Sequence, residues 1–219
     1  MYTIVSIERQ PRQKNQFTLT LDDGSSLSLH REVIAKHRIS TGMTVDDEQL
    51  KAWIREGNSK SAVESAMYYL TWRTRTRKQL LDYLSRKGFE AEAAEEAVRK
   101  MEEYGFLNDE KYALDWVQSR KTGKPAGRRK IAYELRSKGI SQDILDQALD
   151  NLTAEDEFRQ AMKLAEKAFE RHRSLPLRER MAKTSQTLQR RGFEWELISR
   201  VLRKLADSED ASEDHLLPD

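Results

Sequence analysis

Apolar and polar positions alternate over the first 30 residues of this 219-residue chain. The alternation runs through residues 17–21 and resumes at residues 27–29, on either side of the turn-forming triplet Asp22-Asp23-Gly24. A period of two is typical of half-buried strands, and an Asp-Gly pair suits a tight hairpin because glycine adopts a positive φ freely. Val5 and Ile7 indicate a short third strand. The chain therefore begins with a predicted β-hairpin.

Helical signals replace this alternation after residue 30. We expect one helix near Arg31–His37 and a second after Thr44, where Thr44-Val45-Asp46-Asp47 resembles a capping box. The second helix is predicted to run to about Arg55, because Gly57-Asn58 interrupts the pattern. Residues 1–58 are thus interpreted as an N-terminal module made of a β-hairpin and helices.

From Ser59 to Leu205 the apolar spacing is helical, and the chain contains an internal repeat. Three glycines, Gly88, Gly139 and Gly192, lie 51 and 53 residues apart, and each follows a basic residue. Such a glycine fits the left-handed position that ends a helix. Apolar residues recur at the same five distances after each glycine, on one face of a following helix. They are Ala93, Ala94, Ala97, Val98 and Met101, then Ile144, Leu145, Ala148, Leu149 and Leu152, then Leu197, Ile198, Val201, Leu202 and Leu205.

Each repeat is predicted to hold three helices. A further helix precedes each glycine-centred pair, over about residues 60–73, 109–121 and 154–173. The predicted fold is mainly α, with three tandem three-helix repeats in an elongated array, at residues 59–107, 108–153 and 154–205. Residues 206–219 hold six acidic residues and no basic one, so we expect a disordered acidic tail.

Catalytic and metal-binding patterns are missing from the sequence. The chain has no cysteine, and its four histidines fall in different predicted elements. The segment from Gly123 to Arg128 has three residues between its glycines and no Lys-Ser or Lys-Thr pair, so it does not match a P-loop. We predict a protein that is not an enzyme and uses no metal or cofactor. The N-terminus lacks a signal-peptide layout, and no apolar run is long enough to span a bilayer, so we predict a cytoplasmic location.

Charge is distributed unevenly along the chain, although its net value is only +2. Residues 1–58 have a net charge of 0, residues 59–205 of +8, and residues 206–219 of −6. Basic residues gather where the first helix of each repeat meets the second. These three junction clusters are Arg73, Arg75, Arg77 and Lys78; then Arg120, Lys121, Lys124, Arg128, Arg129 and Lys130; then Arg171, Arg173, Arg178, Arg180 and Lys183.

The junction clusters have two interpretations. At equivalent places in an elongated array they would form a basic stripe, which matches the repeating charges of a filament or a nucleic-acid backbone. The alternative is a solvated helical surface. Aromatic residues accompany the clusters, and although base stacking is open to them, their helical spacing favours a place in the core. They are Tyr68, Tyr69, Trp72, Tyr112, Trp116, Phe158 and Phe169.

Three segments of the chain resemble the RecX family. They are residues 69–80 (YLTWRTRTRKQL), residues 105–113 (GFLNDEKYA) with the following Trp116, Val117 and Arg120, and residues 127–140 (GRRKIAYELRSKGI). The resemblance covers about residues 60–205, and the N-terminal part is similar to the extension of longer family members. The third repeat matches through its glycine-centred pair, where Thr184 takes the place of the apolar Leu80 and Ile131.

The resemblance implies a function that composition does not. RecX proteins regulate the bacterial recombinase RecA, typically restraining its filament on single-stranded DNA together with its ATPase and strand-exchange activities. They are described as tandem three-helix repeats that lie along the filament groove, and the family has no active site. The resemblance therefore implies a regulator that meets RecA and single-stranded DNA, directly or through the filament. We expect the protein to be monomeric and to have no membrane partner. Two alternatives stay open: a protein that binds nucleic acid directly, and an adaptor solenoid for another acidic protein.

Overall fold

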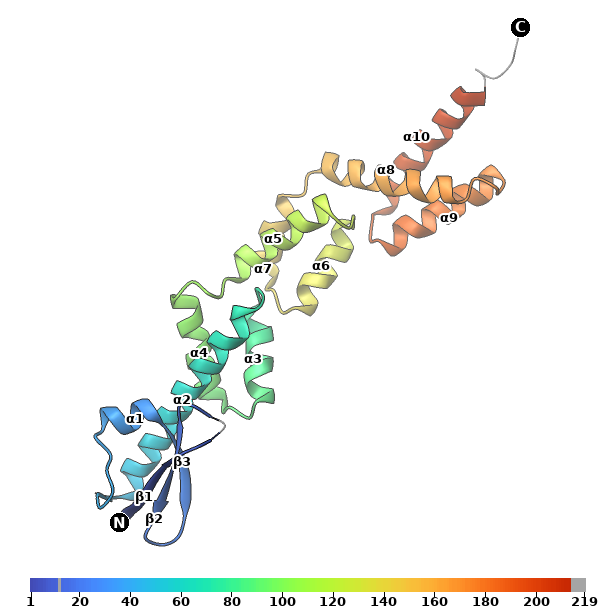
Figure 1. Ribbon diagram of the computed structural model, residues 1–219. Coiled ribbons are helices and arrows are strands. Elements are labelled where there is room, and N and C mark those ends of the chain that lie inside the picture. The colour runs from blue at the N-terminus through green and yellow to red at the C-terminus, as the bar shows by residue number, and fades with distance from the viewer. Residues whose placement is uncertain (12, 214–219) are drawn as a thin grey trace. The chain divides into compact units, whose positions relative to one another are not determined.

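The computed structural model describes residues 1–11 and 13–213 (Figure 1). Within these residues the chain forms ten helices and one four-stranded sheet. It divides into two compact units between Asn108 and Asp109. The predicted mainly helical fold with a small N-terminal sheet is thereby confirmed. None of the described helices is long and apolar enough to cross a membrane.

The N-terminal sheet is antiparallel and contains the predicted hairpin. Its strands are β1 (Tyr2–Arg9), β2 (Gln16–Leu21), β3 (Ser26–His30) and β4 (Thr44–Val45), in the order β3-β2-β1-β4. Leu19 of β2 pairs with Leu27 of β3, and Gly24 in the turn has a φ of 83°. The predicted short strand at Val5 and Ile7 is in fact the eight-residue β1, which pairs on both edges. One face of the sheet is buried, because Leu19 and Leu29 are inaccessible to solvent.

Two helices follow the sheet, and the second differs from the prediction. Helix α1 (Arg31–Lys36) lies where a helix was expected. Helix α2 (Asp47–Thr71) is capped by Asp46, which exchanges hydrogen bonds with Gln49, and Thr44 lies in β4 instead. The helix continues through Gly57-Asn58, so the predicted module boundary after residue 58 falls inside it.

Gly57 is a packing residue rather than a helix stop. It is buried in α2, and a Cβ atom at this position would lie 3.4 Å from the backbone nitrogen of His30. Gly57 therefore packs against the end of β3 from within the helix, at a modest cost in helix propensity. The N-terminal module and the first repeat share this one helix.

The first repeat adds α3 (Arg77–Arg86) and α4 (Ala91–Glu103) to the C-terminal half of α2. Gly88 between them has a φ of 86°, as predicted for a helix-ending glycine. Leu84, four residues earlier, is fully buried, and so is Met101 on the predicted inner face of α4.

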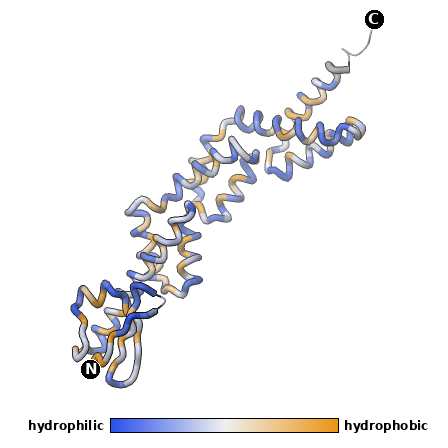
Figure 2. Tube along the Cα trace, in the orientation of Figure 1, coloured by the Kyte–Doolittle hydropathy of each residue, from blue (hydrophilic) through white to orange (hydrophobic). Residues whose placement is uncertain are grey.

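The second unit contains two more three-helix repeats. One is formed by α5 (Asp109–Thr122), α6 (Arg128–Ser137) and α7 (Gln142–Asp150), and the other by α8 (Ala154–Arg171), α9 (Leu177–Arg190) and α10 (Trp195–Glu213). Gly139 and Gly192 have φ values of 84° and 80°. Leu135 and Leu188 are completely buried, which confirms the predicted register. Hydrophobic positions recur along each helix in Figure 2, as the repeat requires.

The predicted disordered tail is wrong in its first half. Helix α10 does not end near Leu205 but continues to Glu213, while residues 214–219 lie outside the described part of the chain. Both guanidinium Nη atoms of Arg180 in α9 donate to the Glu209 carboxylate, at 3.0 and 3.1 Å. This pair holds the acidic segment against the third repeat, an interaction that composition alone does not indicate.

Candidate polyanion-binding surface

In the first junction cluster, two basic side chains are paired with nearby carboxylates. Arg77 at the start of α3 reaches Glu95 and Glu102 of α4, the latter at 2.8 Å. Lys78 pairs with Asp82 one turn along the same helix at 2.7 Å. These exposed ion pairs are weak, so a partner with denser negative charge can displace the carboxylates.

The other two arginines of this cluster differ in exposure. Arg73 is exposed beyond the end of α2. Arg75 is half-buried, and its guanidinium carbon lies 4.8 Å from the centroid of the Tyr69 ring, which itself stacks on Tyr83. Arg75 thus contributes to packing as well as to charge. By contrast, Trp72 is 72% exposed, which contradicts the core role predicted for it. Tyr68 is also exposed.

In the second junction cluster, Arg120 belongs to a closed polar group. It donates to the Glu134 carboxylate from Nε at 3.0 Å and from Nη2 at 2.8 Å. The Trp116 indole nitrogen donates to the same carboxylate oxygen, and the Arg120 guanidinium lies over the Trp116 ring. Because this arginine is already satisfied, we regard it as a structural residue joining α5 to α6.

Lys121 and Arg128 connect the second repeat to the start of the third. Lys121 donates to Asp156 at 2.7 Å, and this hydrogen bond holds the pKa of the Asp156 carboxyl below its ordinary value. Arg128 donates from Nη2 to the Leu152 carbonyl at 2.9 Å, and its backbone nitrogen donates to Glu157 at 2.8 Å. Lys121 and Arg128 therefore help to hold the second repeat against the start of the third, in addition to any contact with a partner.

The remaining bases of the second cluster are more available. Lys124 is exposed, and no ion pair reaches it within residues 1–11 and 13–213. Arg129 is 72% exposed and has Glu194 at 3.6 Å. Lys130 is half-buried beside Gly192. These three side chains are the accessible charges of this cluster.

The third junction cluster contains one residue that must be removed from the predicted surface. Arg180 is 9% exposed, it is paired with Glu209, and its guanidinium carbon lies 3.7 Å from the centroid of Phe169. A partner cannot reach a guanidinium enclosed in this way without breaking the repeat. Arg173 is exposed and pairs with Glu170. The other members are exposed with no ion pair inside the described ranges: Arg171, Arg178 and Lys183.

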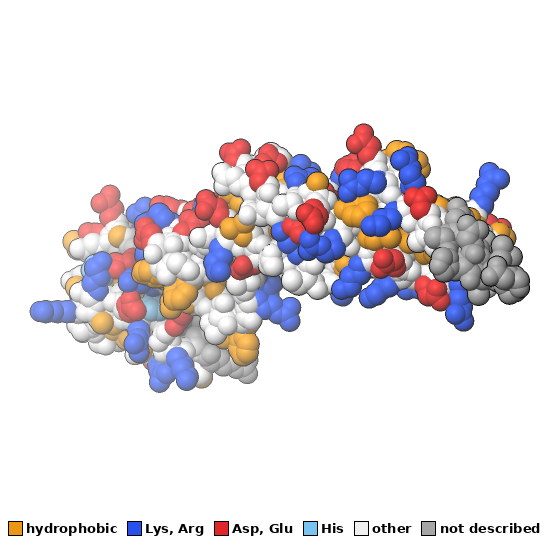
Figure 3. All heavy atoms as spheres, turned by 90° about the horizontal axis from the view of Figure 1, so that it is seen from above, with side chains coloured by type: hydrophobic (Ala, Val, Ile, Leu, Met, Phe, Trp, Pro, Cys, Tyr) orange, Lys and Arg blue, Asp and Glu red, His pale blue; other side chains and the backbone are white. Residues whose placement is uncertain are grey.

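Basic and acidic side chains are interspersed on the face shown in Figure 3. The junction clusters supply separate exposed cations, several of them next to carboxylates. For Arg77, Arg120 and Arg180 the sequence could not show the pairing, because the carboxylate partner of each lies on another helix.

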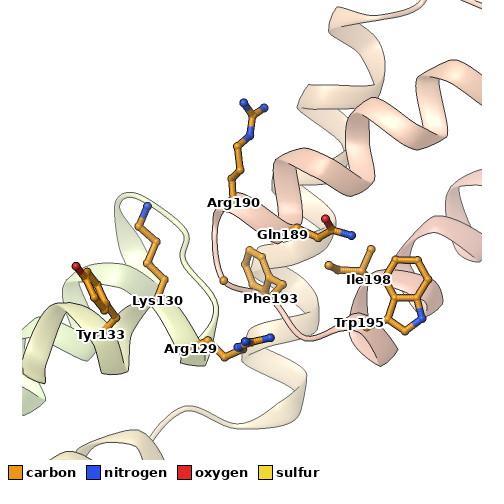
Figure 4. A pocket seen from close by; sticks show the side chains of 9 residues that line it. Arg129, Lys130, Tyr133, Gln189, Arg190, Phe193, Trp195 and Ile198 are labelled. Carbon is orange, nitrogen blue, oxygen red and sulfur yellow. The ribbon is translucent and has the colours of Figure 1, made fainter.

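A groove in the second unit adds residues that the sequence did not indicate. It has a volume of about 610 Å³ and lies between α6 on one side and the α9–α10 turn on the other (Figure 4). Its lining residues are Arg129, Lys130, Tyr133, Gln189, Arg190, Gly192, Phe193, Trp195 and Ile198. Tyr133 and Trp195 do not occupy the apolar positions that recur in every repeat. An aromatic residue outside those positions is the sequence feature that could have indicated this groove.

Comparison with known proteins gives the same three-part division of the helical region. Models of the first, second and third three-helix domains of RecX match residues 62–101, 108–149 and 155–202. A protein from Clostridium perfringens named Regulatory protein RecX is 32% identical over 95% of this chain and 99% of its own length. The Regulatory protein RecX of Bacillus subtilis is 28% identical, over 94% of this chain and 78% of its own length.

Solved structures resemble the chain as well. A crystal structure of regulatory protein RecX aligns with a TM-score of 0.71 and 27% identity, over 92% of this chain and 98% of the other. The crystal structure of RecX from Lactobacillus salivarius gives a TM-score of 0.63 and 26% identity, over 68% of this chain and 97% of the other.

Proposed function

The chain belongs to the RecX family of regulatory proteins, and on this basis we propose that it binds the RecA recombinase and its filament on single-stranded DNA, and restrains the ATPase and recombination activities of that filament. The observation that carries the proposal is the match of all three helical repeats, in order, to the three RecX domains. The proposed site of action is the bacterial cytoplasm, where such filaments form.

Accessible cations support an electrostatic contribution to this binding. A nucleoprotein filament presents phosphates and acidic side chains at regular spacing, and several exposed cations acting together can bind such a polyanion although each single pair is weak. Lys124, Arg178 and Lys183 are the clearest candidates, because each is exposed and none has an ion pair inside the described ranges. Arg120 is left out of this role because its guanidinium is already bound by Glu134, and Lys121 and Arg128 are weaker candidates because each already makes an internal hydrogen bond.

The test is the single-stranded-DNA-dependent ATPase of RecA, measured with and without this protein. We expect the ATPase rate to fall as the protein is added. The triple variant Lys124→Ala, Arg178→Ala and Lys183→Ala should fold normally and lose at least half of the inhibition. The matched control removes three other exposed cations of the same unit, through Lys163→Ala, Lys167→Ala and Arg203→Ala.

Three results would count against the proposal or part of it. An ATPase rate that does not change on adding the protein would refute the proposed function. Equal loss of inhibition in the triple variant and its control would show that net charge, and not these positions, is responsible. Inhibition that disappears in excess single-stranded DNA, together with no binding to RecA in the absence of DNA, would show that the protein acts by sequestering DNA, which is the direct nucleic-acid-binding alternative.

A further inference from the structure

The groove between α6 and the α9–α10 turn is lined by three basic side chains. Arg129 and Lys130 come from the first turn of α6, and Arg190 comes from the end of α9. None of the nine lining residues is acidic. Glu194 approaches Arg129 at 3.6 Å, but its side chain is 55% exposed, so it can move into solvent. The groove is therefore suited to an anionic ligand.

Two large aromatic side chains are exposed at the same groove. Tyr133 is 73% exposed and Trp195 is 62% exposed. Figure 4 shows them on opposite sides, with the buried Phe193 between them. Elsewhere in the chain, Tyr112 stacks on Trp116 and Tyr69 stacks on Tyr83. Within the described residues neither Tyr133 nor Trp195 has a ring or cation–π partner, so their faces are free to stack on a ligand.

The two sides of the groove are held in direct backbone contact. The Gly127 nitrogen donates to the Arg191 carbonyl at 2.9 Å. A Cβ atom at Gly127 would lie 2.4 Å from the Gly192 carbonyl oxygen, and one at Gly192 would lie 2.5 Å from the Lys130 nitrogen. Only glycine permits this approach of the second repeat to the third. The backbone segments that carry the two aromatic residues are thus held at a fixed separation before a ligand arrives, which lowers the entropic cost of binding.

We propose that this groove binds a short segment of single-stranded nucleic acid, with phosphates on Arg129, Lys130 and Arg190 and bases stacked on Tyr133 and Trp195. A single strand presents a phosphate and a flat base at every nucleotide, so it uses both kinds of lining residue at any register. An acidic peptide would use the cations but offers a flat group only occasionally. In a duplex the bases are already stacked and cannot reach the rings.

This inference deepens the proposed function, since it rests on a partner that contains single-stranded DNA, but its test omits RecA. Binding of a labelled oligothymidylate of about 16 nucleotides, near the upper end of known site sizes, is measured by fluorescence anisotropy. The double variant Tyr133→Ala and Trp195→Ala should raise the Kd at least about tenfold, because each stacked base contributes substantially. The matched control is Tyr104→Ala with Phe106→Ala, two aromatic residues that are also exposed.

The basic residues have a separate readout. Log K for the oligonucleotide falls as log salt rises. In the variant Arg129→Ala with Arg190→Ala this negative slope should become less steep by about 1.4, since each lost phosphate contact on a single strand removes about 0.7. The control variant Lys167→Ala with Arg203→Ala should leave the slope unchanged. Trp195→Phe should retain most of the binding, whereas Trp195→Leu should not, because phenylalanine keeps a ring that can stack.

Three outcomes would overturn the inference. The first is a folded Tyr133→Ala and Trp195→Ala variant that binds the oligonucleotide as the parent does. The second is equal affinity for a duplex of the same length, which would leave the rings without a role. The third is displacement of the oligonucleotide by polyglutamate at equal charge concentration, which would identify an acidic-peptide site. RecA is absent from these measurements, so a negative result here would refute the groove proposal without affecting the ATPase test of the proposed function. An unchanged RecA ATPase would refute the proposed function without affecting the groove proposal.

Discussion

The ion pair between Arg180 and Glu209 should stabilise the third repeat and keep the end of α10 helical. Its side chains are 11% and 36% exposed, so the pair is intermediate between a surface pair and a buried one. Surface pairs contribute about 0–1 kcal/mol, and removing one partner of a buried pair costs about 3–5 kcal/mol. Glu209→Ala removes both acceptors and leaves the enclosed guanidinium unpaired. We therefore expect a loss of about 2 kcal/mol in the free energy of unfolding.

For a chain of this size, that loss corresponds to a fall in Tm of about 4–8 °C. The assay is urea denaturation followed by far-UV circular dichroism, with hydrogen exchange of the amides of α10 as a local readout. Asp207→Ala is the matched control, because Asp207 is an exposed acidic residue of the same segment and no ion pair reaches it within the described ranges. Equal changes in stability for Glu209→Ala and Asp207→Ala would refute this role of the ion pair, and so would exchange of the amides near Glu209 at unfolded rates in the parent protein.

Three further changes test the core and one surface group. Leu135→Ala should cost about 2–5 kcal/mol in a thermal or urea melt, because Leu135 is completely buried. Thr184→Val should raise stability by about 1 kcal/mol in the same melt, since the Thr184 hydroxyl is buried without a hydrogen-bond partner. A hydrogen bond from Lys36, and to a smaller extent one from His37, lowers the pKa of Glu56 below its usual 4.5. The Glu56 carboxylate therefore stabilises the folded protein above pH 4.5, and this stabilisation is lost as the pH falls through the folded-state pKa. Glu56→Gln should accordingly flatten the stability profile on the acidic side of pH 4.5, and an unchanged profile would contradict this assignment.

The repeat core could be predicted because its signals are local. Gly88, Gly139 and Gly192 all have positive φ, and the leucines four residues before them are all inaccessible to solvent. Each signal depends on a helix end or a helix face, and both are encoded within about ten residues of sequence. The repeat register also predicts the burial of Thr184, which is fully buried at the position that Leu80 and Ile131 occupy in the other repeats.

The errors concern residues whose role depends on a distant segment. Gly57 reads as a helix stop in isolation, but it is buried inside α2, where it packs against the His30 backbone at the end of β3. The segment after Leu205 has the composition of a disordered tail, yet Arg180, 29 residues before Glu209, pairs with it. Neither contact produces a repeating pattern in the sequence, because each depends on a single residue in the segment that was misinterpreted.

The same distinction explains why the junction clusters could be located but not sorted into accessible and enclosed charges. Clustering of Lys and Arg is visible in sequence, whereas the availability of each charge depends on which carboxylate the fold brings near. Arg120 is satisfied by Glu134 of the next helix, and Arg180 by Glu209, while Lys124 remains exposed. An internal carboxylate held in place by the fold competes with any external phosphate for the guanidinium, so we expect enclosed arginines to add little to the proposed polyanion binding. The groove beside Tyr133 follows the same principle, since Tyr133 and Trp195 are exposed and have no ring partner within the described residues, so that the proposed ligand can reach their faces.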